Sequence, residues 1–155
     1  METEIRNLEE GFWIAGLAAE TNYDPQELSA ALGRLWQQFN VQNIVGQLPD
    51  RLGTQIYCVY TDYCDEPSIP GTIILGGRVE EAAEIPEHLS AVKIPSGNYS
   101  VVHAEGHLPF ATRDAWDGID EELEDRTYRT DFEIYDARSL APGKAEVEIC
   151  IGVDS

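Results

Sequence analysis

The two halves of this 155-residue chain carry the same order of sequence patterns. The segment GRLWQQF can be laid over RDAWDGI, CVYTDY over EIYDAR, and LGGRV over CIGV. Trp36 then matches Trp116 and Tyr60 matches Tyr135, with separations that drift by a few residues, as loops of different length allow. These matches indicate an internal duplication of one supersecondary unit. The duplication restricts the fold to two similar halves that share a core.

Each half is predicted to form a strand, a helix and two further strands, over about 11–80 in the first repeat and 89–153 in the second. The patterns place these elements at residues 11–21, 23–40, 54–63 and 71–80, and again at 89–106, 109–126, 127–137 and 144–153. In the first helix, Asp24 is a capping residue and Pro25 suits the first helical position. Neither repeat can bury its sheet alone, so we expect an α+β fold in which two helices cover one face of an antiparallel sheet. The length is that of a single domain, residues 1–155.

The segment YRTDFEIYD, residues 128–136, has the two-residue period of a strand with one apolar and one charged face. We expect Phe132 and Ile134 to face the helices, and Glu133 to lie on the opposite face. A hairpin that pairs residue 137 with residue 144 would put Glu133 across from Glu148, where a cation would relieve the repulsion between two carboxylates. Antiparallel sheets also commonly leave one face in water, where acids need no ligand. The pattern alone leaves both interpretations open.

The matching face of the first repeat would present Cys58, Tyr60, Ile74 and Gly76, so it is apolar and aromatic where the second repeat is acidic. Rings that supply flat contact, next to a carboxylate that supplies charge, favour a lipophilic cation as ligand.

The net charge is strongly negative, with 29 acidic against 10 basic residues, a formal charge of -19 and a pI near 4.2. Such a chain repels phosphate backbones, so direct nucleic-acid binding is excluded as a working hypothesis. Cations are drawn towards it, although net charge can also simply maintain solubility.

The three cysteines, Cys58, Cys64 and Cys150, are an odd number without a C-x-x-C motif, which is typical of buried thiols in a reducing cytoplasm. The first residues are acidic where a signal peptide would be basic, and the apolar run FWIAGLAA is too short to span a bilayer. We therefore expect a cytoplasmic protein without a membrane partner.

Four segments, in their order and spacing, resemble the gyrase-inhibitory-protein-like (GyrI-like) effector-binding family: VYTDYCDEPSIPGTIILGGRV, VKIPSGNYSVVHAEG, AWDGI and RTYRTDFEIYD with AEVEICIGV. The same module forms the ligand domain of multidrug-responsive activators of the MerR and AraC types. The resemblance spans roughly Gly11 to Val153, and DFEIYD is its most specific part. No helix-turn-helix is expected before Gly11, so the chain resembles a stand-alone module, similar to those of integron cassettes.

The resemblance implies a ligand cleft between the two repeats for small, hydrophobic, cationic molecules, with Glu133 facing the ligand. It implies an aromatic wall that includes Tyr60 and Tyr135. Further candidates from the resemblance are Phe12, Trp13, Tyr57, Tyr99, Phe110 and Trp116. The analysis of the sheet faces adds Cys58 and Glu148.

No metal or cofactor is predicted. His103 and His107 have the spacing of a helical zinc pair, but they lie in a predicted strand, where four residues span roughly 13 Å. The sequence has no phosphate-binding loop, dinucleotide fingerprint or serine-hydrolase elbow. Trp36 is expected to belong to the core.

Two other functions remain open at this stage. Some branches of the family resemble hydrolases of strained electrophiles, in which Glu133 could act as general base. The family's name also suggests a protein partner, gyrase or a regulator, that would meet the acidic residues of 114–125.

Overall fold

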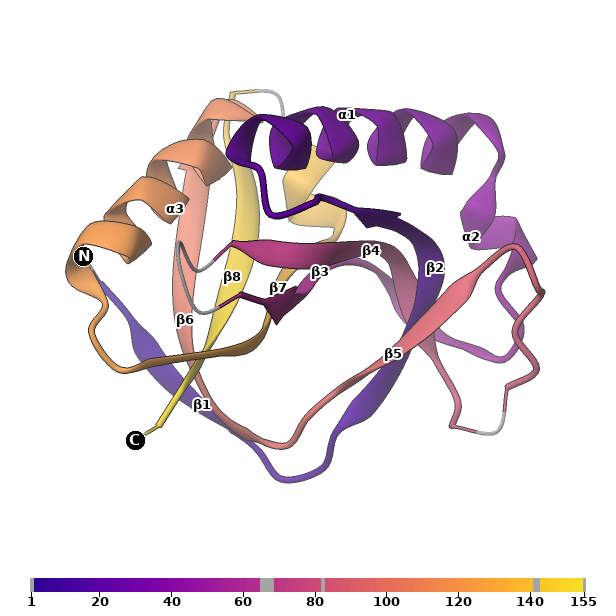
Figure 1. Ribbon diagram of the computed structural model, residues 1–155, viewed down its shortest axis with the longest axis horizontal. Coiled ribbons are helices and arrows are strands. Elements are labelled where there is room, and N and C mark those ends of the chain that lie inside the picture. The colour runs from indigo at the N-terminus through magenta and orange to yellow at the C-terminus, as the bar shows by residue number, and fades with distance from the viewer. Residues whose placement is uncertain (1, 65–68, 82, 141–142, 155) are drawn as a thin grey trace.

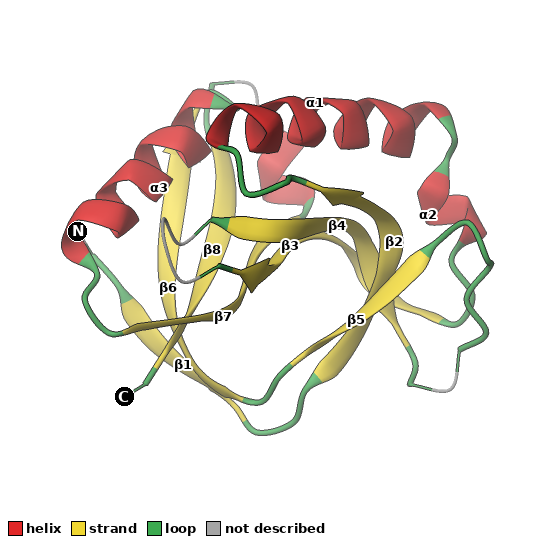
Figure 2. Cartoon of the chain, viewed as in Figure 1, coloured by secondary structure: helices red, strands yellow, loops and turns green. Residues whose placement is uncertain are grey.

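The computed structural model describes residues 2–64, 69–81, 83–140 and 143–154. These residues form eight strands and three α-helices, whose arrangement is shown in Figures 1 and 2. Their bounds are β1 Glu4–Leu8, β2 Phe12–Glu20, α1 Pro25–Val41, α2 Ile44–Gln47, β3 Arg51–Tyr63, β4 Pro70–Val79, β5 Ser90–Ile94, β6 Gly97–Gly106, α3 Phe110–Glu122, β7 Arg126–Tyr135 and β8 Ala145–Val153. A 3₁₀ turn, Ala137–Leu140, lies between β7 and β8. The connections from β3 to β4 and from β7 to β8 lie partly outside the described residues.

The strands form one sheet with the order β1-β6-β8-β7-β3-β4-β2-β5. The first repeat supplies β2, α1, β3 and β4, and the second supplies β6, α3, β7 and β8, as the duplication predicts. The repeats meet where β3 pairs antiparallel with β7. The strand order is therefore equivalent on both sides of this central pair, with β8, β6 and β1 on one side and β4, β2 and β5 on the other.

A further strand precedes each repeat and pairs with the other repeat. β1 pairs with β6 of the second repeat, and β5 pairs with β2 of the first. Sequence analysis did not predict β1, and it read residues 89–106 as one strand-like segment with a turn or bulge. The chain instead breaks between Ile94 and Gly97, because Gly97 has a φ of 144° that sends the strand to a new partner.

Helices α1 and α3 lie on the same side of the sheet, which curls away from them as a half-barrel (Figures 1 and 2). Asp24 caps α1 by accepting a hydrogen bond from the Gln26 amide at 2.8 Å. Leu35 and Phe39 then bury the inner face of this helix against β2 and β4. Under α3, Ile119 packs on the β6 and β8 residues, Val147 and Ile149 among them.

The side of the sheet without helices is also a core, which corrects one expectation. Phe132 and Ile134 lie there, in a buried cluster with Tyr57, Val59 and Ile74, and not towards the helices. Because the sheet curls around this side, apolar residues on it are enclosed without a covering helix. Residues 131, 133 and 135 consequently face α1 and α3.

The register of β7 with β8 differs by one residue from the conditional pairing considered above. Glu133 lies opposite Ile149, and Glu148 lies opposite Ile134. A shift of one residue moves a side chain to the other face of a sheet, so Glu133 and Glu148 are on opposite faces.

Candidate functional site

The candidate site lies at the junction of the two repeats. Cys58 of β3 is directly opposite Glu133 of β7, and the match of Tyr60 with Tyr135 also makes Cys58 and Glu133 equivalent positions of the two repeats. Equivalent residues that pair with each other must sit on the pseudo-twofold axis. The side chain at this axis is therefore covered by both repeats at once.

Glu133 is enclosed, with 3% of its surface exposed, and it is held by three neutral donors. The hydroxyls of Tyr60 and Tyr135 each donate to Oε1 at 3.0 Å, and Trp116 Nε1 donates to Oε2 at 2.8 Å. The two tyrosines are repeat equivalents, so the duplication itself delivers two matched donors to one carboxylate oxygen.

Two tryptophans, one from each helix, cross over this pair of tyrosines. Trp36 of α1 packs edge-on against Tyr135, with ring centroids 4.9 Å apart, and Trp116 of α3 does the same to Tyr60 at 5.3 Å. Each helix thus covers the tyrosine of the other repeat. We define these four rings as the aromatic box. Trp36 was expected in the core but is half-buried in this box, a position that its match with Trp116 could have revealed.

The electrostatics of the box keep the hydroxyl and thiol donors protonated and make the charged form of Glu133 less favourable than it is in water. Burial raises the pKa of Glu133, while hydrogen bonds from Trp116, Tyr60, Tyr135 and Cys58 lower it in part. Burial and the nearby carboxylate raise the pKa of both tyrosines well above the usual value. The pKa of the Cys58 thiol is also raised, mainly by burial and further by the nearby Glu133.

A second acid, Asp131, lies on the same face of β7 and is fully buried. Unlike Glu133 it has a cationic partner, because Arg126 Nη2 lies 3.0 Å from its Oδ2. Tyr63 donates to Oδ2 at 2.6 Å, and the Gly152 amide donates to Oδ1 at 2.9 Å. Burial raises the pKa of Asp131, and these partners oppose the rise.

The structure brings together five of the predicted site residues: Glu133, Tyr60, Tyr135, Trp116 and Cys58. The other six lie elsewhere, Tyr57 among them, which belongs to the buried cluster on the side without helices. Trp13, on β2, packs against the cluster beneath α1, and Phe110 is 61% exposed at the start of α3.

Phe12, Tyr99 and Glu148 lie away from the aromatic box. Phe12 belongs to the cluster on the side without helices, with the guanidinium of Arg78 4.6 Å from its ring. Glu148 is paired with Arg6 of β1 at 3.0 Å. This partner was missed because β1 itself was not predicted.

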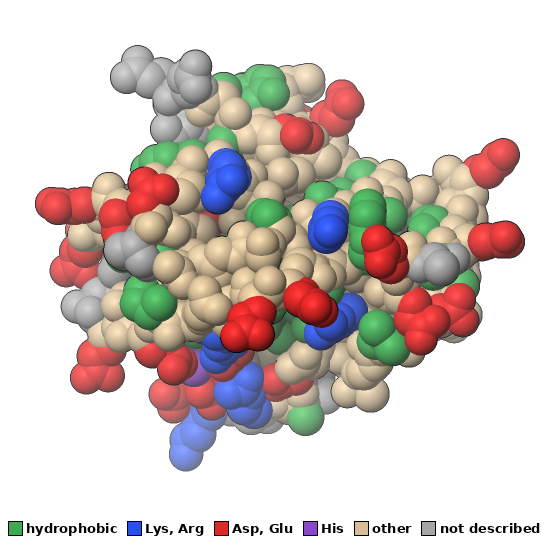
Figure 3. Space-filling view, turned by 90° about the horizontal axis from the view of Figure 1, so that it is seen from below, with side chains coloured by type: hydrophobic (Ala, Val, Ile, Leu, Met, Phe, Trp, Pro, Cys, Tyr) green, Lys and Arg blue, Asp and Glu red, His purple; other side chains and the backbone are tan. Residues whose placement is uncertain are grey.

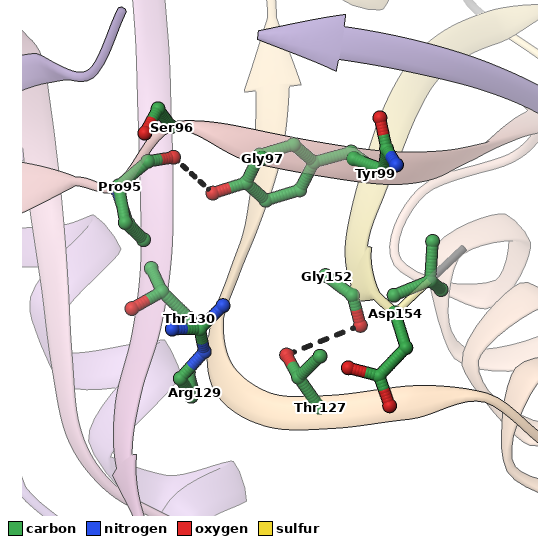
Figure 4. A pocket seen from close by; sticks show the side chains of 11 residues that line it. Pro95, Ser96, Gly97, Tyr99, Thr127, Arg129, Thr130, Gly152 and Asp154 are labelled. Atoms are coloured by element: carbon green, nitrogen blue, oxygen red, sulfur yellow. Dashed lines mark hydrogen bonds between the residues drawn. The ribbon is translucent and has the colours of Figure 1, made fainter. Parts of the chain in front are cut away.

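Tyr99 lines a separate cavity of about 180 Å³ at the β5–β6 turn and the bulged start of β7 (Figure 4). Its hydroxyl donates to the Pro95 carbonyl at 2.6 Å, and Thr127 donates across the cavity to the Gly152 carbonyl at 3.4 Å. Tyr99 is thereby fixed away from Glu133.

A larger hollow of about 520 Å³ opens at the ends of β2, β3 and β4. It is lined by Glu20, Asn22, Tyr23, Asp62, Tyr63, Gly71 and Thr72, so its described wall holds two carboxylates and two tyrosines. Tyr63 connects it to the site, because its hydroxyl reaches Asp131.

Among the residues that the structure describes, no three His, Cys, Asp or Glu side chains are grouped so as to hold a metal ion. His103 instead lies 3.2 Å from Glu4 and 3.6 Å from Glu146. Within the same residues, no helix is long and apolar enough to cross a membrane.

A half-barrel of two repeats, with an enclosed and aromatic-lined carboxylate at their junction, defines a protein of the effector-binding class. The chain belongs to the family of integron-associated effector-binding proteins, Cass2, whose family model matches residues 4–153. The resemblance recognised in the sequence is thus confirmed. A comparison with curated proteins gives no match.

Solved structures share the fold at low sequence identity. A Staphylococcus aureus protein assigned to transcription regulation is 17% identical, with a TM-score of 0.76 over 100% of this chain and 99% of its own. The protein SAV2435, bound to tetraphenylphosphonium, is 16% identical, with a TM-score of 0.74 over 100% and 95%. The Vibrio cholerae integron cassette protein VCH_CASS2 is 23% identical, with a TM-score of 0.67 over 98% and 95%.

Proposed function

We propose that this protein binds small hydrophobic cations between α1 and α3, with Glu133 as the counter-charge and the aromatic box as the wall. One observation carries the proposal. Among the described residues, Asp131 is paired with Arg126 and Glu148 with Arg6, whereas the buried Glu133 has only neutral donors. The positive charge that Glu133 lacks is the charge that a ligand would bring.

The energetics support a cationic ligand over a neutral one. A buried carboxylate without a cation retains much of its desolvation penalty, and hydrogen bonds offset only part of it. A cation against the box would gain that electrostatic attraction together with ring contacts, each worth about 0.5–2 kcal/mol when desolvated. A neutral molecule of the same shape would gain the ring contacts alone.

Access to Glu133 requires movement, because only 3% of its surface is exposed. Trp116 closes the α3 side, and Tyr135 beneath Trp36 closes the α1 side. A ligand must displace at least one of these rings, so binding is coupled to a local rearrangement of the box.

Two further observations support the assignment. SAV2435, which shares the fold, has been solved with tetraphenylphosphonium, a lipophilic cation. The protein surface is also acidic overall, and in Figure 3 acidic side chains are spread around the rim of the side away from the helices, with fewer basic ones among them. A negative surface raises the local concentration of cations and their association rate.

The donors around Glu133 favour binding over hydrolysis. A general base must accept a proton from water, yet both oxygens of Glu133 already accept hydrogen bonds and only 3% of its surface is exposed. The acids of α3 are partly engaged within the molecule, since Asp120 pairs with Arg126 at 2.8 Å. Neither alternative function has a comparable observation in its favour.

The proposal is tested by calorimetric titration with tetraphenylphosphonium and with neutral triphenylphosphine oxide. Glu133→Gln is expected to weaken the cation at least tenfold and the neutral compound hardly at all. Glu124→Gln, at an exposed position, makes the same change in net charge and is expected to leave both affinities unchanged. Equal weakening of cation and neutral compound in Glu133→Gln would contradict the role of the charge.

A further inference from the structure

We infer that Arg126 limits the ligands of this protein to a single positive charge, because its guanidinium occupies the second acidic position of the site, Asp131. This inference rests on the proposed function and concerns the same site. According to this inference, Arg126 determines whether the site prefers a monocation or a dication, although it does not contact Glu133.

Arg126 fills a cation site built from the same kinds of groups as the aromatic box. Its side chain is 4% exposed and pairs with Asp131 at 3.0 Å and with Asp120 at 2.8 Å. Its guanidinium carbon lies 4.3 Å from the ring centre of Tyr128, 5.8 Å from that of Trp116 and 6.0 Å from that of Tyr63. Carboxylates and ring faces around one cation are the features that we propose for the ligand at Glu133.

The local backbone is shaped to bring Arg126 to this place. The pairing of β7 with β8 shifts between Arg126 and Asp131, so that extra residues bulge from β7. Tyr128 within the bulge has a φ of 55°, a left-handed conformation that is uncommon for a tyrosine. The bulge turns Arg126 back onto Asp131, five residues further along the same strand.

The two acidic positions are neighbours. Asp131 and Glu133 lie on one face of a regular part of β7, so their Cα atoms are about 6.6 Å apart along the strand. Trp116 joins them, because its indole donates to Glu133 while its ring lies beside the guanidinium of Arg126. Of the two acids on this face, only Glu133 is left for an external cation.

A dication would place its second charge near Asp131, where it would meet Arg126. Like charges in an enclosed site repel strongly, so the dication is rejected while a monocation of the same shape is accepted. On this side Asp131 lies next to the hollow of about 520 Å³, since Tyr63, which donates to Asp131, also lines that hollow.

The test uses two planar aromatic cations of nearly the same shape, N-methyl-4-phenylpyridinium and the dication N,N′-dimethyl-4,4′-bipyridinium. The affinity ratio is measured by calorimetry. The wild type is expected to prefer the monocation at least tenfold. Arg126→Gln keeps an amide donor for Asp131 but removes the charge, and is expected to shift the ratio at least tenfold towards the dication.

Two controls separate charge from shape. Arg126→Lys keeps the positive charge and is expected to retain the wild-type ratio. The double variant Arg126→Gln with Asp131→Asn leaves one free acid again and is expected to restore the preference for the monocation. The double variant has no buried, unpaired charge at position 131, so it should be more stable than Arg126→Gln. It can therefore still be titrated if Arg126→Gln proves too unstable.

The outcomes distinguish this inference from the proposed function. If the wild type binds neither compound, both fail. If the monocation binds in a manner that depends on Glu133, but the ratio is the same in wild type and Arg126→Gln, only the role of Arg126 is overturned. An equal shift in Arg126→Lys and Arg126→Gln, or a double variant that prefers the dication, overturns it as well.

Discussion

Cys58 and Glu133 face each other across β3 and β7 at positions that the internal duplication makes equivalent. The pseudo-twofold axis of the molecule therefore passes between a thiol and a carboxylate. The surroundings are nearly symmetric, since Tyr60 and Tyr135 flank the axis and each is covered by the tryptophan of the other repeat. A carboxylate could therefore stand at either of two equivalent positions, 58 or 133, and in this protein it stands at position 133.

This symmetry predicts that the charge can be moved across the axis. Glu133→Cys alone should weaken tetraphenylphosphonium at least about tenfold, or ~1.4 kcal/mol. Adding Cys58→Glu should recover most of that loss, because the new carboxylate lies between the same two tyrosines. Calorimetric titration of both variants and of Cys58→Glu alone measures this, and a swapped variant as weak as Glu133→Cys would show that the two positions are not interchangeable.

The affinity for monocations should fall as the pH is lowered. Burial raises the pKa of Glu133 above the usual 4.5, so it takes up a proton at a higher pH than an exposed glutamate does, and a protonated Glu133 offers no charge. Titrations between pH 8 and pH 5 should show the decline in wild type and a flat profile in Glu133→Gln. A parallel decline in Glu133→Gln would assign it to the surface acids.

The raised pKa of Glu133 also predicts the direction of its effect on stability. The folded state holds this proton more tightly than the unfolded state, so the contribution of Glu133 to stability is greatest below pH 4.5 and is lost as the pH rises through the raised pKa. The stability of Glu133→Gln, measured by urea unfolding, should therefore decrease less than that of the wild type as the pH rises through this range. Glu124→Gln, the surface control, should keep the wild-type pH profile.

Tryptophan fluorescence should report binding from two of the three tryptophans. Trp36 and Trp116 belong to the aromatic box, whereas Trp13 packs on β2. Saturating tetraphenylphosphonium should change the emission of a variant that retains Trp36 or Trp116 alone, and leave one that retains only Trp13 nearly unchanged. A response confined to the Trp13-only variant would place the ligand outside the box.

Glu148→Gln should leave cation affinity within about twofold, because this residue lies on the other face of the sheet. Its effect should be on stability. The hydrogen bond from Arg6 lowers the pKa of Glu148, so the pair contributes above about pH 4.5 and its contribution is lost as the pH falls through the lowered pKa. Arg6 is 42% exposed, so we expect a loss of about 1 kcal/mol or less at pH 7 in urea unfolding, and a smaller loss as the pH falls below the usual pKa of a glutamate.

Much of the fold could be predicted because its elements have clear periods. The cap at Asp24 and the apolar spacing located α1, and the alternation in YRTDFEIYD located β7. The strand β1 was missed because EIRNL is short, mostly exposed and paired with residues that lie 89 to 97 positions away, from Leu8–Gly97 (97 − 8) to Glu4–Val101 (101 − 4). No local pattern encodes such a partner.

The site was predicted in part. Alternation placed Glu133 and Tyr135 on one face, but it could not tell which face meets the helices when both are buried. The register of β7 with β8 depends on a 3₁₀ turn that sequence did not reveal, and a single residue separates Glu148 from the site. The pairing of Arg126 with Asp131 follows from a bulge with a left-handed Tyr128, for which the sequence carries no turn residue.

The two strands that pair with the other repeat, β1 and β5, also govern the order in which this protein can form during synthesis. When the first repeat has left the ribosome, β2 still lacks its outer neighbour β5, and β1 has no partner at all until β6 appears. The amino-terminal segment must therefore wait, unpaired, for most of translation. The two halves cannot mature one after the other, and the last strand made, β8, joins β6 to β7 and closes the connection between them. A nascent chain released before β8 would leave the inner edges of β6 and β7 open, and open strand edges favour aggregation.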